Sequence, residues 1–243
     1  MGTPMFPSVD SDSKQFPDAV RARVAANLAD SSTVEGQAAA ALVTQAFGKA
    51  GLPVDAPHPL VAAITGDEFE DANGTALAAH QTTVGQKTWT AHIGTFATVG
   101  DRLQSVSSND GDLASYDAGA LASATITATV YPATSNGGMV APALVFRLID
   151  PSNFWYLTPN APGSGVYLYR VTSGSHSLIL DVRAPDIKPG AAYDLRVDLY
   201  GPDITVWVGG VEIATVTDAG NIAGTRVGVR LGKNGGATGP AQW

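Results

Sequence analysis

The sequence contains no cysteine, little charge and no long apolar run. Its 243 residues hold no cysteine, which excludes disulfides, thiolate catalysis and cysteine-based metal sites. Only 15% of the residues are charged and the net charge is -8. Binding to a phosphate backbone requires clustered Lys and Arg, so we expect no nucleic-acid partner. No segment approaches the ~20 apolar residues of a membrane span, and the start, Met-Gly-Thr-Pro-Met-Phe, lacks the pattern of a signal peptide. We therefore expect a soluble chain without membrane insertion.

Glutamate and histidine are also scarce, which bears on catalysis. The glutamates are Glu35, Glu68, Glu70 and Glu212, and the histidines are His58, His80, His92 and His176. None of them forms a His-Glu-x-x-His motif, and no Gly-x-Ser-x-Gly elbow occurs. The run Asn109-Asp-Gly-Asp112 lacks the full pattern of a calcium loop and is typical of a turn. The sequence therefore predicts no catalytic site, no metal site and no cofactor.

Short alternating runs dominate the rest of the chain. Between residues 121 and 232, apolar side chains recur at every second position, as in Ile126, Ala128 and Val130, and turn residues such as Gly209-Gly210 separate the runs. Period-two alternation with glycine-rich turns is typical of an antiparallel sandwich. We predict a mainly β protein whose residues 66–243 form one β-sandwich, with Phe69, Trp89 and Phe146 in its core.

The first 54 residues have a different pattern. Two apolar stripes at helical spacing predict two short helices, which we interpret as an arm for assembly or attachment. The candidate assembly residues on these stripes are Val20, Val24, Leu28, Leu42 and Phe47. Helices this short are marginal in water unless their apolar faces pack on something. The partner could be another copy of the chain or a larger assembly; alternatively, the helices form a hairpin that covers one sheet. Residues 55–65 are rich in proline and predict a stiff linker.

Aromatic and arginine side chains alternate with the apolar sets on the predicted strands. Rings stack on the C–H faces of sugars, and guanidinium groups donate hydrogen bonds to hydroxyls. The candidate carbohydrate-binding residues are Arg147, Tyr167, Tyr169, Arg196, Tyr200, Trp207 and Arg230. The alternative is a solvated sheet face stabilised by cross-strand pairs.

A series of residues resembles the concanavalin A-like jelly-roll domain of the LamG and laminarinase type. The matching residues are Asp67-x-Phe69, Asn73-Gly-Thr75-x-Leu77, His80, Gly85, Trp89, Phe146-Arg147-x-x-Asp150-x-x-Asn153-Phe-Trp-Tyr156, Tyr167-Leu-Tyr-Arg170 and Ile204-Thr-Val-Trp-Val-Gly-Gly-Val-Glu-Ile213. The resemblance covers residues 66–243 and implies a sandwich of a kind that often holds sugars. Laminarinase-type enzymes carry two glutamates and an aspartate at alternate positions of one strand, and this chain has no such run. Such jelly rolls usually end in a strand that pairs with the first, whereas this sequence stops at Trp243. That strand is either stunted or completed by a neighbouring chain.

The arm resembles the N-terminal part of minor tail proteins of actinobacterial phages. This resemblance rests on residues 16–30 and 35–42. It implies a structural virion protein, located in the tail after assembly in the host cytoplasm. The implied partners are other tail proteins, copies of the same chain in a homo-oligomer such as a trimer, and a host-surface polysaccharide. Two alternatives stay open: a purely architectural tail spacer or capsid decoration without glycan binding and, more distantly, a glycoside hydrolase.

Overall fold

The structure, a computed structural model, describes residues 65–107, 110–135, 138–160, 165–183, 190–233 and 242–243. The chain divides into two units, Met1–Ala62 and Ala63–Trp243, and all described residues belong to the second unit. The predicted helical arm, with its candidate assembly residues, lies outside the described residues and stays a prediction. The described residues include no helix with the length and apolar character needed to cross a bilayer.

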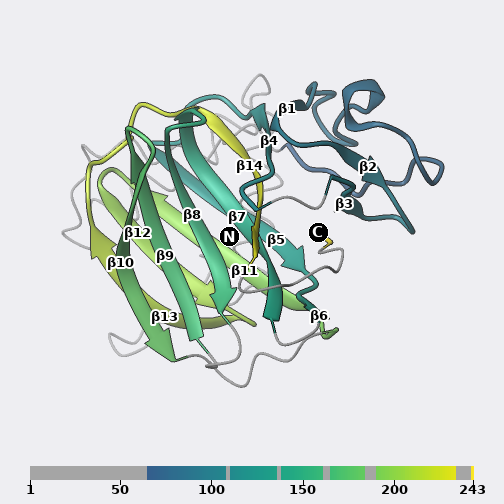
Figure 1. Cartoon of the computed structure of the whole chain (residues 1–243). Helices are drawn as coiled ribbons and strands as arrows, with labels where there is room; N and C mark the ends of the chain where they lie inside the picture. Colours follow the sequence, from purple (N-terminus) through teal and green to yellow (C-terminus); the bar gives the residue numbers. More distant parts are fainter. Residues whose placement is uncertain (1–64, 108–109, 136–137, 161–164, 184–189, 234–241) are drawn as a thin grey trace, which may run out of the picture. The chain divides into compact units, whose positions relative to one another are not determined.

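The described residues form fourteen strands and one 3-10 turn (Figure 1). In chain order these elements are η1 (Leu77–Ala79), β1 (Thr90–Ile93), β2 (Phe96–Thr98), β3 (Leu103–Ser105), β4 (Leu113–Asp117), β5 (Ser123–Val130), β6 (Ala133–Ser135), β7 (Gly138–Asp150), β8 (Asn153–Asn160), β9 (Gly165–Thr172), β10 (Ser175–Arg183), β11 (Tyr193–Tyr200), β12 (Asp203–Val208), β13 (Val211–Thr217) and β14 (Arg226–Lys233).

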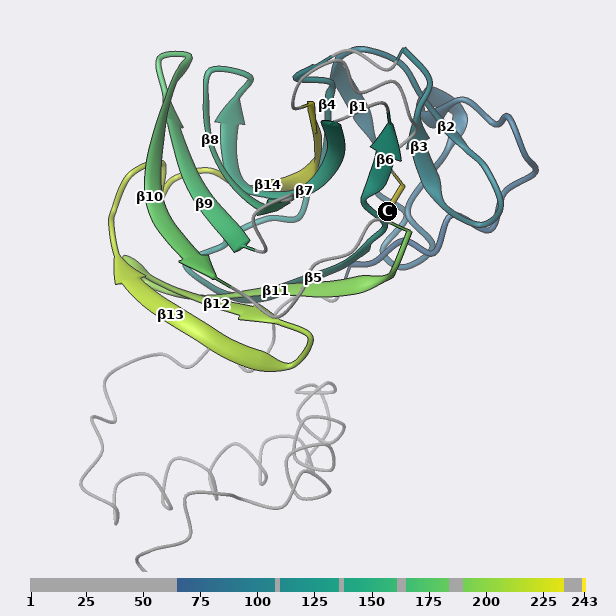
Figure 2. The ribbon, with the colours of Figure 1, turned by 60° about the horizontal axis from the view of Figure 1, so that its bottom comes forward.

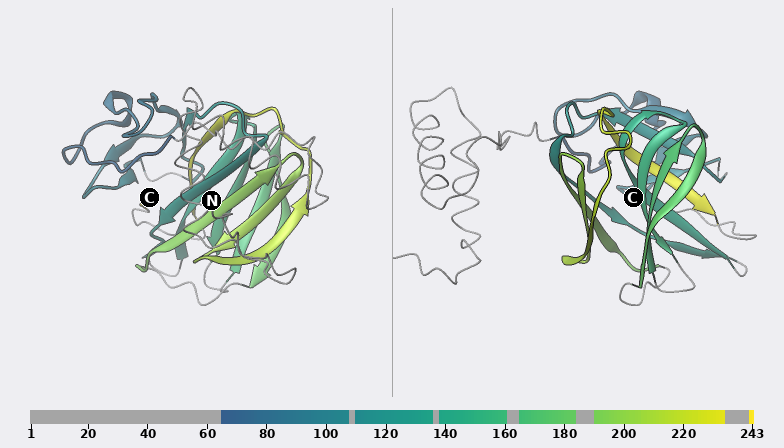
Figure 3. Two further views of the ribbon diagram at one scale, coloured as in Figure 1. Left: turned by 180° about the vertical axis from the view of Figure 1, so that it is seen from behind. Right: turned by 90° about the vertical axis from the view of Figure 1, so that its left-hand side faces the viewer.

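The strands form a sandwich of two antiparallel sheets. The larger sheet has the order β1-β4-β14-β7-β8-β9-β10, with β6 paired to β7 as its eighth strand. The smaller sheet has the order β13-β12-β11-β5, and β2 and β3 form a separate ribbon. Viewed from behind, the four strands of the smaller sheet lie in front of the larger one (Figure 3). The predicted mainly β, antiparallel sandwich is therefore confirmed.

The core lies between the two sheets and follows the predicted alternation. Leu195, Val197 and Leu199 on β11 are all buried, because every second side chain of a strand points to the same face. Phe146 and Trp155 lie in the same core with their ring centroids 6.2 Å apart. Phe69 and Trp89 are also buried there. These positions confirm the core that the sequence predicts.

A second apolar cluster covers the outer face of the eight-stranded sheet. It consists of Leu113, Ala143, Val145, Leu148, Phe154, Tyr156 and Val171. Figure 2 shows that this sheet curves, with its outer face on the inside of the curve. Side chains on a concave face converge and cover one another, and for this reason Val145 is as fully buried as its core-facing neighbours. We call this surface the concave face.

The four outermost strands of the two sheets differ in regularity. Bulges or irregularities interrupt the pairing of β1 with β4, of β10 with β9 and of β13 with β12. In contrast, β5 pairs with β11 over eight consecutive positions without a shift. Among the described residues, no strand pairs with the other edge of β5.

Gln242 and Trp243 lie against the sandwich. Gln242 makes isolated bridges to Gln104 and Tyr131. The side chain of Trp243 is buried, and its indole Nε1 donates a hydrogen bond to the carbonyl of Ala143 at 3.2 Å.

Candidate functional site

The candidate carbohydrate-binding residues do not share one face. Tyr167 and Tyr169 on β9 and Arg230 on β14 lie on the concave face of the eight-stranded sheet. The remaining exposed candidates, Arg196, Tyr200 and Trp207, belong to β11 and β12, on the outer face of the four-stranded sheet. Because the core separates the two sheets, these outer faces point in opposite directions (Figure 2). The prediction of a single aromatic and arginine face is therefore wrong.

The concave face brings together five polar or aromatic side chains, which we call the concave-face cluster: Tyr156, Tyr167, Tyr169, His176 and Arg230. The rings of Tyr156 and Tyr169 stack, with centroids 4.9 Å apart and planes inclined by 12°. Tyr167 meets Tyr169 edge-on at 6.0 Å. The guanidinium of Arg230 lies 4.9 Å from the centroid of the Tyr156 ring. The result is a continuous aromatic surface with a cation held against it.

The polar atoms of this cluster are partly tied to one another. The Tyr156 hydroxyl lies 3.0 Å from Nδ1 of His176. Burial raises the pKa of Tyr156 to about 12, with Arg230 acting in the opposite direction. Burial also lowers the pKa of His176, and the positive charge of Arg230 adds to this effect. At neutral pH the cluster therefore offers neutral hydroxyl and imidazole groups and one guanidinium, all capable of hydrogen bonding to hydroxyl groups.

On the opposite face, the candidate residues are bound to one another. Arg196 donates to Asp198 through Nε at 2.8 Å and Nη2 at 2.6 Å, and its guanidinium lies 4.8 Å from the Trp207 ring centroid. Arg196 and Trp207 are direct cross-strand partners. Such pairs stabilise a sheet by roughly 0.2–1 kcal/mol each. This arrangement matches the alternative that the sequence left open, a sheet face stabilised by cross-strand contacts.

Arg147 lies inside the sandwich, so the prediction that its side chain stands on an exposed face is wrong. It is fully buried, with a backbone φ of +47°, next to an irregularity in the pairing of β7 with β8. Its guanidinium donates to the carbonyls of Gly201 and Asp218. Burial lowers the pKa of Arg147, whereas the charge of Asp218 raises it. Arg147 therefore ties the eight-stranded sheet to loops of the smaller sheet.

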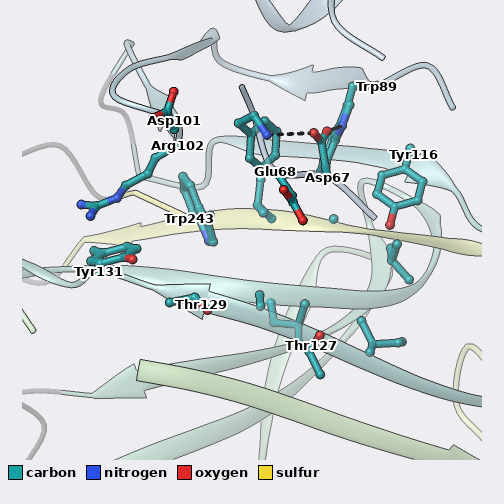
Figure 4. Close-up of a pocket in the computed structure, with 17 residues that line it drawn as sticks. Asp67, Glu68, Trp89, Asp101, Arg102, Tyr116, Thr127, Thr129, Tyr131 and Trp243 are labelled. Carbon is teal, nitrogen blue, oxygen red and sulfur yellow. Dashed lines mark hydrogen bonds between the residues drawn. The ribbon is translucent and has the colours of Figure 1, made fainter. Parts of the chain in front are cut away.

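A cavity of about 360 Å³ opens beside β5, on the core side of the eight-stranded sheet (Figure 4). Its lining includes the aromatic residues Trp89, Tyr116, Tyr131 and Trp243 and the charged residues Asp67, Glu68, Asp101 and Arg102. Thr127 and Thr129, both on β5, also line the cavity. The Arg102 guanidinium lies 3.6 Å from the Tyr131 ring centroid and donates to Oε1 of Gln242 at 3.1 Å.

A buried histidine holds the loop that forms one side of this cavity. His80 Nε2 lies 2.7 Å from Oδ2 of Asp67, and its Nδ1 contacts Asp71. Asp67 also accepts hydrogen bonds from the Trp89 indole at 2.5 Å and from the Phe69 amide at 3.1 Å. Burial lowers the pKa of His80, but the hydrogen bonds and charges of the two aspartates outweigh it, and the net effect is a raised pKa. A structural role for His80 agrees with the sequence interpretation.

Several residues of the concave face and of the cavity could not be predicted from the sequence. Tyr156 follows Trp155, and alternation indicated only that the two face opposite sides; the structure places Trp155 in the core and Tyr156 in the concave-face cluster. Glu68 and Glu70 lie in a loop in which Phe69 has a φ of +52°. No local pattern links Glu68, Arg102 and Trp243, because the fold brings them together from distant segments.

The fold is similar to that of solved proteins that act on or bind carbohydrate, at low sequence identity. The carbohydrate-binding module CBM66 from Bacillus subtilis matches with a TM-score of 0.52 and 21% identity over 63% of this chain and 89% of that chain. The β-glucanase of Bacillus licheniformis matches with a TM-score of 0.50 and 12% identity over 72% and 92%. An endo-acting O-glycanase of the human gut microbiota matches with a TM-score of 0.51 and 8% identity over 75% and 95%.

These likenesses show a concanavalin A-like jelly roll, which confirms the fold that the sequence resemblance implied. They include binding modules and glycanases alike, so they do not distinguish binding from catalysis. No family model and no curated sequence matches this chain. Among the described residues, no group of three His, Cys, Asp or Glu side chains is arranged to hold a metal ion.

Proposed function

We propose that this domain is a non-catalytic, lectin-like module that binds glycan on its concave face. The observation that supports it most is the stacked pair Tyr156 and Tyr169, with Tyr167 at its edge and Arg230 beside it. Tyrosine rings offer apolar faces to the C–H groups of a pyranose, and their hydroxyls can bond sugar hydroxyls at the same time. Arg230 is anchored near Asp110 at 3.8 Å, so its orientation is partly fixed before a ligand arrives.

A binding role suits this face better than a hydrolytic one. Glycoside hydrolysis commonly uses two carboxylates that flank the scissile bond, about 5–9.5 Å apart. The described glutamates lie elsewhere: Glu68 and Glu70 precede η1, and Glu212 is on β13 of the other sheet. Two aspartates adjoin the concave-face cluster: Asp110 pairs with Arg230 at 3.8 Å, and Asp181 on β10 lies opposite Tyr167. The cluster itself consists of aromatic rings, a histidine and an arginine. These groups can orient a sugar, and a reducing-sugar assay on cell-wall polysaccharide would detect hydrolysis.

The proposed setting is a phage tail, with the chain as a minor tail protein and the glycan as a host-surface polysaccharide. Its support is the sequence likeness of the arm to minor tail proteins. In this proposal the arm joins the chain to tail partners and to copies of itself. A sheet face gives few contacts per copy, and several linked copies would increase the apparent affinity by about 10²–10⁴.

The competing proposal is a purely architectural virion protein. The observation in its favour is the face of the four-stranded sheet, where Arg196 is already bound to Asp198 and packed on Trp207. The charge of Arg196 is therefore paired on this face without a ligand. Only the concave face therefore distinguishes the two proposals.

A glycan array with matched tyrosine variants tests the proposed function. Tyr169→Ala should remove binding to host polysaccharide, because it deletes the exposed half of the stacked pair. Tyr200→Ala and Trp207→Ala, on the opposite face, should bind as the parent does. Melting temperatures confirm that all three variants fold. Retention of full binding by Tyr169→Ala, or no binding by the parent protein to any host glycan, would favour the architectural role.

A further inference from the structure

The cavity beside β5 is separate from the concave face. Val227 and Val229 line it, and these side chains belong to the core side of β14, whereas Arg230 points to the concave face. The eight-stranded sheet therefore lies between the two places. A ligand in the cavity would touch none of the residues of the concave-face cluster.

The cavity has the size and the lining of a small-molecule site. Its volume of about 360 Å³ falls at the lower end of the roughly 300–1,000 Å³ typical of ligand pockets. Apolar side chains from both sheets, including Ile126, Leu144 and Val229, form part of the lining. The rings of Trp89, Tyr116 and Trp243 add aromatic walls (Figure 4). Such a site, with aromatic and aliphatic walls beside several polar groups, suits a ligand about as large as one sugar ring.

The polar groups indicate what kind of ligand would fit. Figure 4 shows the carboxylate of Glu68 directed into the cavity. Within the described residues this carboxylate has no hydrogen-bond partner, because only the backbone amide of Glu68 is bonded, to Thr83. Asp101 also lines the cavity. Carboxylate oxygens accept hydrogen bonds and have none to donate, so the ligand must supply donors.

The charges of the cavity lining and the cost of removing water from Glu68 further narrow the kind of ligand that would fit. His80 contacts both Asp67 and Asp71, and the cavity lining holds Asp67, Glu68 and Asp101 against the single cation Arg102. This balance disfavours an anionic ligand such as a phosphate or a uronic acid. A purely apolar ligand would remove water from the Glu68 carboxylate without replacing its hydrogen bonds, which is costly. A neutral pyranose avoids both problems, since its hydroxyls donate to the carboxylate and its C–H faces contact the rings.

We propose that this cavity is a second saccharide site, which receives a single neutral pyranose unit end-on between Glu68 and the Trp89 and Trp243 rings. The site is distinct from the concave face, so it does not depend on glycan binding there. The walls come from segments that the fold has already fixed, including the reciprocal bonds that hold Trp243 to Leu103. The site is therefore formed before a ligand arrives.

The indole N–H signals of the full-length protein provide a direct test. The chain has four tryptophans, of which Trp89 and Trp243 line the cavity, while Trp155 is in the core at Gly220 and Trp207 is on an outer face. We would titrate the protein with the methyl pyranosides of glucose, galactose and mannose into the millimolar range and record proton–nitrogen correlation spectra. We expect at least one sugar to shift the Trp89 and Trp243 signals and to leave those of Trp155 and Trp207 in place.

Two neighbouring glutamates supply a matched pair of variants. Glu68→Gln should weaken the binding measured at the cavity signals by about 10- to 100-fold, as expected for hydrogen bonds to a charged group. Glu70→Gln, two residues away and outside the lining, should bind as the parent does. Asp101→Asn is a further variant that keeps the fold, because asparagine tolerates the φ of +56° at this position. It should also weaken binding.

The outcomes separate this proposal from the proposed function. Tyr169→Ala should keep the cavity shifts even though it loses glycan binding on the concave face. The proposal is overturned if no sugar moves the Trp89 and Trp243 signals, or if Glu68→Gln and Glu70→Gln bind equally well. It is also overturned if those signals move with protein concentration instead of sugar, because a second copy would then cover the cavity.

Discussion

Leu103 and Trp243 exchange two backbone hydrogen bonds. The Leu103 amide donates to the Trp243 carbonyl at 3.0 Å, and the Trp243 amide donates to the Leu103 carbonyl at 3.1 Å. The Trp243 ring packs near Phe96, with centroids 6.2 Å apart. One residue thus joins the β2-β3 ribbon to the core of the sandwich and forms a wall of the cavity.

We expect Trp243→Ala to destabilise the domain by about 3–5 kcal/mol, the usual cost of deleting a buried aromatic side chain. The free energy of unfolding of an ordinary domain is only about 5–15 kcal/mol. Urea unfolding measures the change. Trp207→Ala is the control: its half-exposed ring makes a cation–π contact with Arg196 of about 0.5–1 kcal/mol. Equal losses in the two variants would show that Trp243 is not part of the core.

Gly224 lies against the backbone of Arg147 and leaves no space for a side chain. A Cβ atom at Gly224 would come within 2.3 Å of the carbonyl carbon and oxygen of Arg147. Gly224→Ala should therefore cost about 1–3 kcal/mol or more of unfolding free energy, because backbone atoms must shift. At Gly66 a Cβ meets nothing within 4 Å, so Gly66→Ala should be neutral or slightly stabilising. Thermal unfolding of both variants checks this, and an unchanged Gly224→Ala protein contradicts it.

The stability of the domain should depend on pH through His80. Burial lowers the pKa of His80, the two aspartates raise it by more, and the folded value lies above the ordinary 6.5. Protonated His80 therefore stabilises the folded state; this contribution is complete below pH 6.5 and is lost as the pH rises through the folded pKa. His92 and His176 have lowered pKa values, so their effect has the opposite sign and appears as the pH falls below 6.5.

Urea unfolding at a series of pH values measures this dependence. Subtracting the profile of a His80→Gln variant isolates the His80 contribution, and a proton NMR titration assigns each pKa to its ring. A His80 ring that titrates below His176 in the folded protein would refute the expected order.

The predicted arm should control the oligomeric state. Replacing Val24 and Leu28 together by Asp places charge on the predicted apolar stripe, and we expect the full chain to become monomeric in light scattering. Asn27→Asp adds one charge beside the stripe and should leave the oligomer intact. The melting temperature of the β domain should stay nearly the same in both proteins. If light scattering gives the double variant the same oligomer mass as the parent, these residues have no role in assembly.

Alternation in the sequence was enough to predict the sandwich and much of its core, because it reports which side of its own strand a residue occupies. It does not report which sheet the strand joins. Tyr169 and Trp207 both alternate with core residues, yet their strands lie in different sheets and the two rings face opposite ways. The alternation within each strand could not show whether the two rings share one face or lie on opposite faces.

Two further differences have local physical causes. The irregularity near Arg147 breaks the period of two, so a side chain that alternation places outside enters the sandwich instead. Curvature of the larger sheet buries Val145 on a face expected to be solvated. Glu68, Arg102 and Trp243 line the cavity together but are far apart in the sequence, so no local pattern predicts it.

The regular outer edge of β5 has a practical consequence for handling the protein. Sheet edges are usually shielded by charge, proline or bulges, since exposed N–H and C=O groups recruit foreign strands. The eight residues of β5 are Ser, Ala, Thr, Ile and Val only, and their pairing with β11 has no bulge. In concentrated samples, we therefore expect the protein to aggregate first by pairing through this edge. A single lysine at the exposed position Thr125, opposite Asp198 and outside the cavity lining, is the smallest change that would keep them dispersed.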